Sequence, residues 1–585
     1  MTHSSPRHTI DALLQECKRD RQQAEHRSRS ISISRLILFL AAILMSVLFL
    51  NTNAILWIIS ASICMILFFA FIGLHSRLFR ELSLLRCREK VLQNELDCLN
   101  LNPNTYYNGE NFRNNMRHAD DLDLFGRKSL FHLINRCSTK GGQQRLSELL
   151  IEPPLDNDTI LNRQEAVREL SELLDFRIKA MTLLMTTEEN NEIRQKTTSQ
   201  GERKHLALLI GAYVTTMILS IALYAFTGNY LLFIITSITG MMTSFYSNRK
   251  STEIHKELDG LKNTYAIYSL VMKDFASLDM RASLLKKMQD KGRSSIEAFN
   301  NLSKIAESFD RRHNIAWLLL SNILFLNDII LQQRYHRWMT AHNTELQTWC
   351  DILTELEILL SISGFAYGNP SYCFPILSDT MKIDAKELRH PLIPHNVCVA
   401  NDINISDSPR FMLITGSNMS GKSTWLRTVG VNMVLAQIGA PVAANYFSWS
   451  PMIILTSLRQ SDSLAENTSL FMNELKQLQR ILKTVEDKHR ALILLDEILR
   501  GTNSDDKFAG SQALALKLGK INCITIMATH DLKLSELESQ QPEVYKNYCF
   551  ESSSDGGSLT FDYKMREGVA VNRNATWLMR EMNII

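Results

Sequence analysis

Four long apolar blocks interrupt an otherwise ordinary alternation of polar and apolar residues. They form two pairs, 35–50 with 54–74 and 206–226 with 230–246, and each pair is separated by only three uncharged residues. A run of about 20 apolar residues matches the hydrocarbon thickness of a bilayer. Each pair therefore predicts a transmembrane helical hairpin with a small turn. The alternative is a pair of buried helical hairpins in a soluble protein.

Charged residues around the blocks favour one orientation. Basic side chains flank both pairs on the side where the chain enters and leaves, at Arg27, Arg29, Arg35, Arg77, Arg80, Arg203, Lys204, Arg249 and Lys250. Because basic residues gather on the cytoplasmic side of membrane proteins, we expect a multi-pass protein of the inner (cytoplasmic) membrane, with its N-terminus and all polar regions in the cytoplasm. About 30 polar residues precede the first block, which is not typical of a cleaved signal peptide.

Amphipathic helices are predicted for most of the polar sequence before residue 376. Apolar residues recur at helical spacing in two stretches: Leu78, Leu82, Leu85, Leu92 and Leu96, and later Leu346, Trp349, Leu353, Leu356 and Leu360. The first stretch predicts that the second span continues as a helix into the cytoplasm. The other predicts a long helix that ends near residues 368–370. From about residue 376, short β-rich runs alternate with helices, which indicates an α/β domain.

Composition excludes several classes of protein. With 21% charged and 45% hydrophobic residues, the chain is not mostly disordered. Its 64 Lys+Arg and 61 Asp+Glu leave a formal charge of only +3, so any contact with a polyanion must be local. The ten cysteines include no C-x-x-C pair and no zinc-type spacing, and they are expected to be reduced thiols in a cytosolic setting.

A phosphate-binding loop is predicted between a strand and a helix. The apolar run 410–415 leads into Gly416, Ser417, Asn418, Met419, Ser420, Gly421, Lys422, Ser423 and Thr424, which fit the pattern G-x-x-x-x-G-K-[ST]. In such a loop the backbone N–H groups bind phosphate oxygens, Lys422 contacts the β- and γ-phosphates, and the Ser423 hydroxyl binds Mg²⁺. The sequence therefore predicts a site for a nucleoside triphosphate and Mg²⁺.

Two more predicted strands end in candidate catalytic groups. The apolar run 491–495 leads into Asp496, a candidate Mg²⁺ ligand, and Glu497, a candidate general base for the attacking water. Taken alone, an acidic pair is commonly only a strand end. A third run, 523–528, precedes His530, which would lie at the carboxyl edge of the same parallel sheet, where ligands bind. The alternative is a histidine that caps a helix.

Together these segments closely resemble the ATPase domain of the MutS mismatch-repair family. The resemblance rests on residues 415–424, 496–502, 528–530, 389–391 with 400–403, and 469–474. Upstream, residues 122–131, 139–142, 152–154 and 162–167 resemble the start of that family's α-helical core domain. The resemblance covers roughly 120–200 and 376–585, with a weaker helical middle.

The resemblance implies an ATP hydrolase that works as a homodimer and drives conformational change on DNA. Each site would take residues from both protomers, and Ser469 is similar to the family's serine that contacts the partner's γ-phosphate. The family's adenine-stacking aromatic falls near Cys398 here, which leaves Tyr563 as the aromatic candidate.

Several departures from the family pattern change what is expected. The mismatch-reading domain has no counterpart, the second hairpin occupies the region of the DNA clamp, and no C-terminal helix-turn-helix is expected. Leu499 also stands where the family has glycine. Direct mismatch reading and encirclement of DNA are therefore not expected, whereas nucleotide binding is.

The predicted fold is multidomain: a mostly α-helical, MutS-core-like region with two transmembrane hairpins, followed by an α/β P-loop ATPase domain. The expected segments are a polar cytoplasmic arm at 1–34, the first hairpin at 35–75, a helical connector with the first part of the core at 76–204, the second hairpin at 205–246, the second part of the core at 247–375 and the ATPase domain at 376–585.

Three functions remain open at this point. The favoured one is a membrane-anchored MutS-like ATPase that binds DNA, in mismatch repair or another form of DNA processing, supported by the basic residues Lys286, Lys287, Lys291, Arg293, Arg311 and Arg312. The second is an ATP-driven membrane switch coupled to a protein partner without DNA. A transporter of the ABC type is disfavoured, because the four predicted spans carry no ionisable residue within the membrane to line a path and no Leu-Ser-Gly-Gly-Gln segment occurs.

Overall fold

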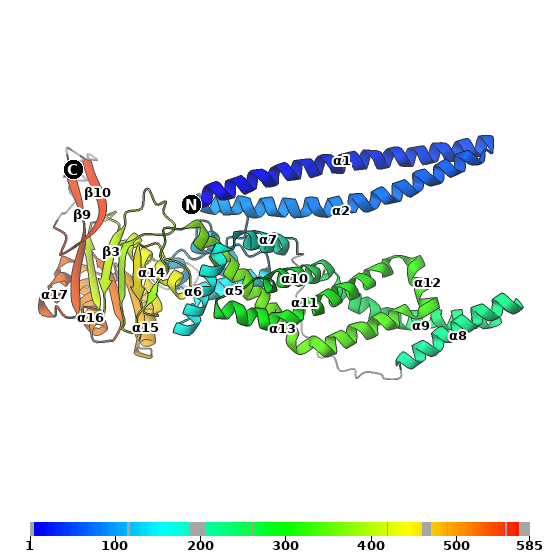
Figure 1. Cartoon of the computed structure of the whole chain (residues 1–585). Helices are drawn as coiled ribbons and strands as arrows, with labels where there is room; N and C mark the ends of the chain where they lie inside the picture. The colour runs from blue at the N-terminus through cyan, green and yellow to red at the C-terminus, as the bar shows by residue number, and fades with distance from the viewer. Residues whose placement is uncertain are drawn as a thin grey trace.

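The computed structural model describes residues 5–113, 117–187, 206–259, 261–417, 419–458, 470–487, 490–499, 501–555 and 558–571. The molecule is elongated, with the α/β region at one end and long helices along the rest (Figure 1). The turns of both apolar hairpins point away from the α/β end.

Two continuous helices, α1 (Pro6–Thr52) and α2 (Ile55–Leu99), form the first apolar hairpin. Asn53 ends α1 in the left-handed conformation, with φ 51°, which asparagine tolerates better than most residues. The predicted polar arm lies largely within α1, and it packs along α2, where Arg21 pairs with Glu89 at 3.1 Å. The predicted continuation of the second span as a helix is confirmed by the length of α2.

The helical region between and beyond the hairpins has one continuous core. In it Tyr265 stacks on Phe299, with ring centroids 5.8 Å apart, and Phe299 meets Trp349 edge-to-face, with centroids 5.6 Å apart. The apolar face predicted from Leu346 to Leu360 is buried, which confirms that part of the sequence interpretation. The helices are α3 (Arg117–Asp121), α4 (Leu130–Ile134), α5 (Lys140–Ile151), α6 (Asn157–Glu172), α7 (Leu174–Met185), α10 (Leu261–Ala276), α11 (Ser283–Asp310) and α13 (Asn327–Gly368), with short 3-10 turns η1 (Glu110–Phe112) and η2 (Arg311–His313).

The second apolar hairpin consists of α8 (Leu206–Thr227) and α9 (Leu231–Leu258). A short apolar helix, α12 (Ile315–Phe325), packs against both of them, and the sequence interpretation did not single it out. By length and composition, α1, α2 and α8 could each cross a membrane, and α12 together with α13, bent by 84°, passes the same test as a pair. The helix α9, which was predicted as a span, is not among them.

Two sheets follow from Ile376 onward. The larger sheet has the order β10-β9-β4-β8-β7-β6, and all its pairings are parallel except that of β10 with β9. Its strands are β4 (Phe411–Gly416), β6 (Ile453–Ser457), β7 (Ala491–Asp496), β8 (Ile524–Thr529), β9 (Tyr545–Asp555) and β10 (Ser558–Glu567). The smaller sheet has the order β1-β5-β2-β3, from β1 (Ile376–Leu377), β2 (Ile383–Leu388), β3 (Asn401–Ile405) and β5 (Tyr446–Trp449).

Three apolar runs were predicted to precede the candidate site segments. They are the strands β4, β7 and β8, and each is buried along its whole length. Strands buried on both faces read as continuous apolar runs because helices cover both sides of a parallel sheet. The helices of this region are α14 (Lys422–Gln437), α15 (Leu470–Asp487), α16 (Ser504–Gly519) and α17 (Glu536–Gln540), with a 3-10 turn η3 (Leu532–Ser535).

Candidate nucleotide-binding site

The predicted phosphate-binding loop lies between the end of β4 and the start of α14. Gly416 approaches the neighbouring strand so closely that a Cβ there would lie 2.6 Å from the Phe550 carbonyl oxygen. Gly421 has φ 105° and precedes α14 directly, whereas Met419 adopts φ 69° without the freedom of glycine. Asn418 lies outside the described residues.

Lys422 is buried at the first position of α14, and its Nζ donates to the carbonyl oxygens of Gly416 at 2.9 Å and Ser417 at 2.8 Å. The lysine side chain thus links the helix start to the first two residues of the loop. Ser423 and Thr424 are exposed in the first turn of α14, whereas Ser420 is buried in the loop before it. The N–H groups of a first helical turn have no partner within the helix and carry partial positive charge. The loop therefore offers backbone donors, a cation and a hydroxyl in one place.

The acidic pair lies at the end of β7, and the histidine comes directly after β8. Strand β8 lies between β7 and β4, the strand that leads into the loop. Asp496 ends β7 opposite Ala528 of β8, and the N–H of Glu497 donates to the Ala528 carbonyl at 3.0 Å. Nε2 of His530 contacts Oε1 of Glu497 directly. All these strand ends lie at one edge of the sheet because the strands are parallel. Ser469 lies outside the described residues.

Tyr563 of β10 lies beside the loop. A Cβ built on Gly421 would lie 3.2 Å from Cδ1 of Tyr563, and the side chain is 45% exposed. Asn401 fixes this part of β10, since its Nδ2 donates to the Tyr563 carbonyl at 3.0 Å and its Oδ1 accepts from the Met565 N–H at 2.8 Å. The aromatic ring is thus held against the start of α14.

Glu474 supports the acidic strand end, a role that the sequence did not reveal. It is buried on α15, and its Oε1 accepts a hydrogen bond from the Leu499 N–H at 2.6 Å. Leu499 has φ 60°, a left-handed conformation that explains why the family pattern has glycine at this position. The segment 469–474 was singled out only for its serine, although its glutamate is the residue that orders the loop after Glu497.

Residues of the early helical region join the helices to this site. Asp121 Oδ2 accepts from the Thr456 hydroxyl at 2.7 Å and from the Leu458 N–H at 3.0 Å. Asp123 Oδ2 accepts from Arg427 Nη1, on α14, at 3.2 Å. The sequence signal was the resemblance at residues 122–131, but the sequence did not show which side chains make the contact.

The donor set at the sheet edge fits Mg²⁺. The Ser423 hydroxyl and the Asp496 carboxylate are hard oxygen donors, and Mg²⁺ is usually held by one or two protein ligands together with phosphate oxygens and water. Within the described residues, no group of three or more His, Cys, Asp or Glu could hold a metal by itself.

His390 lies in the segment before the loop. Burial lowers its pKa to about 4, so this histidine is neutral, and its Nδ1 accepts a hydrogen bond from the Leu392 N–H.

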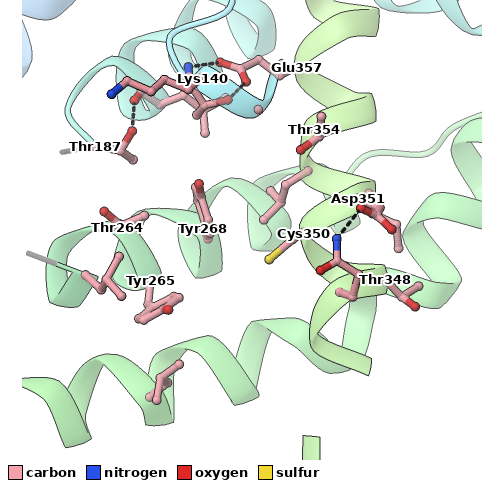
Figure 2. Close-up of a pocket in the computed structure, with 18 of the residues that line it drawn as sticks. Lys140, Thr187, Thr264, Tyr265, Tyr268, Thr348, Cys350, Asp351, Thr354 and Glu357 are labelled. Atoms are coloured by element: carbon pink, nitrogen blue, oxygen red, sulfur yellow. Dashed lines mark hydrogen bonds between the residues drawn. The ribbon is translucent and has the colours of Figure 1, made fainter. Parts of the chain in front are cut away.

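A cavity of about 1640 Å³ lies in the helical region, and its described lining includes no residue of the phosphate-binding loop. Figure 2 shows Tyr265 and Tyr268 on one side, Cys350 and Thr354 on the other, and Lys140 with Glu357 at one end. Oε1 of Glu357 accepts from the N–H groups of Ser138 at 2.6 Å and Thr139 at 3.1 Å.

Comparison with known protein families matches both halves of this architecture. The model of MutS domain III matches residues 104–363, and the model of MutS domain V matches residues 412–576. The chain is a MutS-family protein. Domain V is the ABC-type ATPase domain of this family, and it contains the loop, the acidic pair and the histidine described above. The helical domain III precedes it, and the long apolar helices in and before domain III are mostly exposed.

Individual relatives are similar over parts of their length. "MutS protein homolog 4" of Homo sapiens is 33% identical over 234 residues, which cover 38% of this chain and 24% of the human protein. "DNA mismatch repair protein MutS" of Methanosarcina barkeri is 34% identical over 238 residues, 39% of this chain and 26% of the relative. "MutS protein homolog 4" of Mus musculus is 26% identical over 545 residues, 78% of this chain and 54% of the relative. The chain thus spans between 24% and 54% of these three relatives.

Proposed function

We propose that this protein is a membrane-anchored ATPase of the MutS type, which binds ATP with Mg²⁺ at residues 416–424 and hydrolyses it in a site completed by a second copy of the chain. The single observation that supports nucleotide binding best is the position of Lys422, buried between the start of α14 and the carbonyls of Gly416 and Ser417. A lysine held there needs only to exchange these two acceptors for phosphate oxygens.

The remaining residues take distinct roles in this proposal. Bound Mg²⁺ would neutralise phosphate charge, with Ser423 and Asp496 as its protein ligands. Glu497 accepts the proton of the attacking water. His530 contacts the Glu497 carboxylate and keeps it oriented, so it acts as a positioning residue. Ser469 of one protomer contacts the γ-phosphate bound by the other, and Tyr563 contacts the nucleotide base.

Membrane anchoring is supported by the reversed polarity of the second hairpin. Phe226 and Tyr246 are each 91% exposed, whereas Ser220 is 0% and Thr236 is 6% exposed. In water, apolar side chains face inward and polar ones outward. A helix pair that buries its hydroxyls and exposes its aromatic residues is suited to a hydrocarbon environment. We therefore propose a multi-pass protein of the inner membrane with its ATPase domain and N-terminus in the cytoplasm.

DNA is the favoured binding partner of this ATPase, in mismatch repair or related DNA processing. The support is the similarity to the "DNA mismatch repair protein MutS" of Methanosarcina barkeri and an exposed basic face on α11, which includes Lys286, Lys287, Lys291 and Arg293. Arg312, which the sequence placed with this group, is only 9% exposed and binds Asp328, so it is not part of the surface that would contact DNA.

A second candidate is an ATP-driven membrane switch that acts on a protein partner without DNA. One observation favours it: the helices of the second hairpin, α8 and α9, lie at the end of the helical domain that is far from the ATPase sheet (Figure 1). A surface suited to lipid at that end leaves less of the domain to surround DNA.

One experiment tests the proposal and separates the candidates. The ATPase rate of the full chain in nanodiscs is measured with no DNA and with duplex, mismatched, branched or single-stranded DNA, at two salt concentrations. Stimulation by one DNA form that weakens with salt supports DNA processing, since phosphate contacts release counterions. A basal rate that no DNA changes supports the protein-coupled switch. Absence of any ATP turnover contradicts the proposed activity.

A further inference from the structure

The short helix α12 has the wrong polarity for a helix in water. Ile315 is 71%, Leu320 55% and Phe325 52% exposed, whereas Ser321 is 6% and Asn322 only 1% exposed. A surface helix of a water-soluble domain shows the opposite arrangement. The outward face of α12 is thus suited to an apolar medium, as are the outward faces of α8 and α9 beside it.

The polar groups on the inward face are satisfied within the protein. Asn322 Oδ1 accepts from the Asp328 N–H at 2.8 Å, and Asn322 Nδ2 donates to the Leu318 carbonyl at 3.0 Å. The Tyr213 hydroxyl of α8 lies 2.5 Å from the Ile323 carbonyl oxygen. A polar group without a partner is costly in hydrocarbon, so these contacts are what a lipid-embedded helix requires.

Length and direction show that α12 does not cross a bilayer alone. Its 11 residues span about 16 Å at 1.5 Å per residue, roughly half of the ~30 Å hydrocarbon core. It is bent by 84° from α13, which lies alongside α9, where Gln332 Nε2 donates to the Ser251 hydroxyl at 2.7 Å. The helix α12 therefore runs across α9 instead of beside it.

Two contacts set the position of α12 along the length of α9. A Cβ on Gly240 would lie 3.0 Å from the Cα of Ile323, so the glycine permits the close crossing. At the other contact, Arg312 Nη2 donates to Asn248 at 2.9 Å and its Nε lies 2.9 Å from Asp328 Oδ1, in an ion pair with exposures of 9% and 1%. This pair lies next to Arg249 and Lys250, the basic end of the hairpin.

We propose that α12 is a third membrane-embedded element, which lies across the leaflet on the basic side of the hairpin and does not traverse the bilayer. The occupant of its exposed face is the acyl-chain region of that leaflet, with Trp317 suited to the headgroup boundary. This inference rests on the proposed membrane anchoring. It attaches the start of α13, a single helix of 42 residues that continues toward the ATPase end, directly to the membrane.

The test uses the full chain in liposomes that contain a trace of phosphatidylcholine with a photoactivatable diazirine on its acyl chain. After irradiation, lipid adducts are mapped by peptide mass spectrometry. Adducts are expected on α12 as well as on α1, α2 and α8. The peptide of Leu270, which is 49% exposed on α10 in the polar part of the domain, serves as the internal control and should carry none.

A substitution provides the second measurement. Leu320→Asp should reduce labelling of the α12 peptide at least about fivefold, while labelling of α8 stays unchanged. Leu270→Asp, the matched change at an exposed leucine outside the membrane, should alter neither. If α1, α2 and α8 are labelled but α12 of the unmodified chain is not, the inference is wrong. If none of these helices is labelled, the membrane anchoring itself is wrong.

Discussion

Arg136 Nε donates to Glu95 Oε1 at 2.7 Å, and the two side chains are only 2% and 4% exposed. Glu95 belongs to α2, the second helix of the first apolar hairpin, and Arg136 follows α4 in domain III. Arg136 Nη1 also donates to the carbonyls of Leu133 at 2.9 Å and Ile134 at 2.8 Å. Burial by itself would raise the pKa of Glu95, but the Arg136 charge and hydrogen bond lower it below its ordinary value. This ion pair fastens the hairpin to the helical core.

Removing one partner of this pair should destabilise the helical region strongly. We expect Arg136→Met to lower its free energy of unfolding by about 3–5 kcal/mol, because the buried Glu95 carboxylate loses its ion-pair and hydrogen-bond partner and keeps only the charge of Arg177 nearby. The double variant with Glu95→Leu should lose less than the sum of the two single changes. Arg145→Met, at an exposed pair with Glu148, is the control and should change stability by less than about 0.5 kcal/mol. Thermal and denaturant unfolding of the detergent-solubilised protein measures both, and equal effects of Arg136→Met and Arg145→Met would contradict the assignment.

Glu357 should make stability depend on pH. Burial raises its pKa to about 7 from an ordinary value of 4.5, although Thr139 and Ser138 donate hydrogen bonds to it. The folded protein therefore holds the proton more tightly than the unfolded chain. The resulting stability is fully present below about pH 4.5 and is lost as the pH rises through about 7. At about 1.4 kcal/mol per pKa unit, the change over this window is on the order of 3 kcal/mol.

Glu357→Gln tests this dependence, since glutamine can accept from the same two N–H groups and donate to Thr139 like a protonated carboxyl. The melting temperature of this variant should fall less between pH 5 and pH 8 than that of the unmodified protein. Glu297→Gln, at an exposed position of α11, should leave the pH dependence unchanged. A Glu357→Gln profile parallel to that of the unmodified protein would falsify the pKa assignment.

Substitutions of Lys422 and Glu497 should affect nucleotide binding and ATP turnover separately. Lys422→Ala is expected to weaken ATP binding at least about tenfold, because charge-assisted hydrogen bonds contribute about 1.5–3 kcal/mol each. Glu497→Ala is expected to retain ATP but to lower hydrolysis about 100-fold or more, the range of general-base catalysis. Fluorescent-nucleotide titration and phosphate release measure the two properties. Lys386→Ala and Glu543→Ala, at exposed positions of the same half of the chain, are the controls. Unchanged ATP affinity in Lys422→Ala would contradict the proposed site.

Ser469 should act on the site of the partner subunit. Lys422→Ala and Ser469→Ala homodimers are each expected to hydrolyse ATP poorly. When the two variants are mixed and allowed to exchange subunits, each mixed dimer contains one site with both residues intact, so random pairing should restore roughly a quarter of the full rate. No recovery despite demonstrated exchange would show that Ser469 acts within its own chain, whereas a fully active Ser469→Ala homodimer would show that it has no role in hydrolysis.

The sequence alone determined the local elements of the ATPase site. A strand of apolar residues, a loop with glycine at two positions and a helix that starts at Lys422 are fixed by neighbours in the chain, because backbone conformation and phosphate binding depend on residues a few positions apart. The buried strands β7 and β8 and the buried face of α13 were readable for the same reason. So were the two apolar hairpins, since length and composition suffice to recognise them.

Only the tertiary structure decided which distant side chains meet and which face of a helix is outside. Glu95 and Arg136 are 41 positions apart, and Ser138 and Glu357 are 219 apart, so no local pattern links them. Arg312 looked like part of a basic surface until its contact with Asp328 was visible. The helix α12 is too short to be recognised as a span, and an apolar segment of its length is equally typical of a protein core. Its exposed leucines and buried asparagine have meaning only when the neighbouring helices are in place, because burial is a property of the packed molecule and not of the segment.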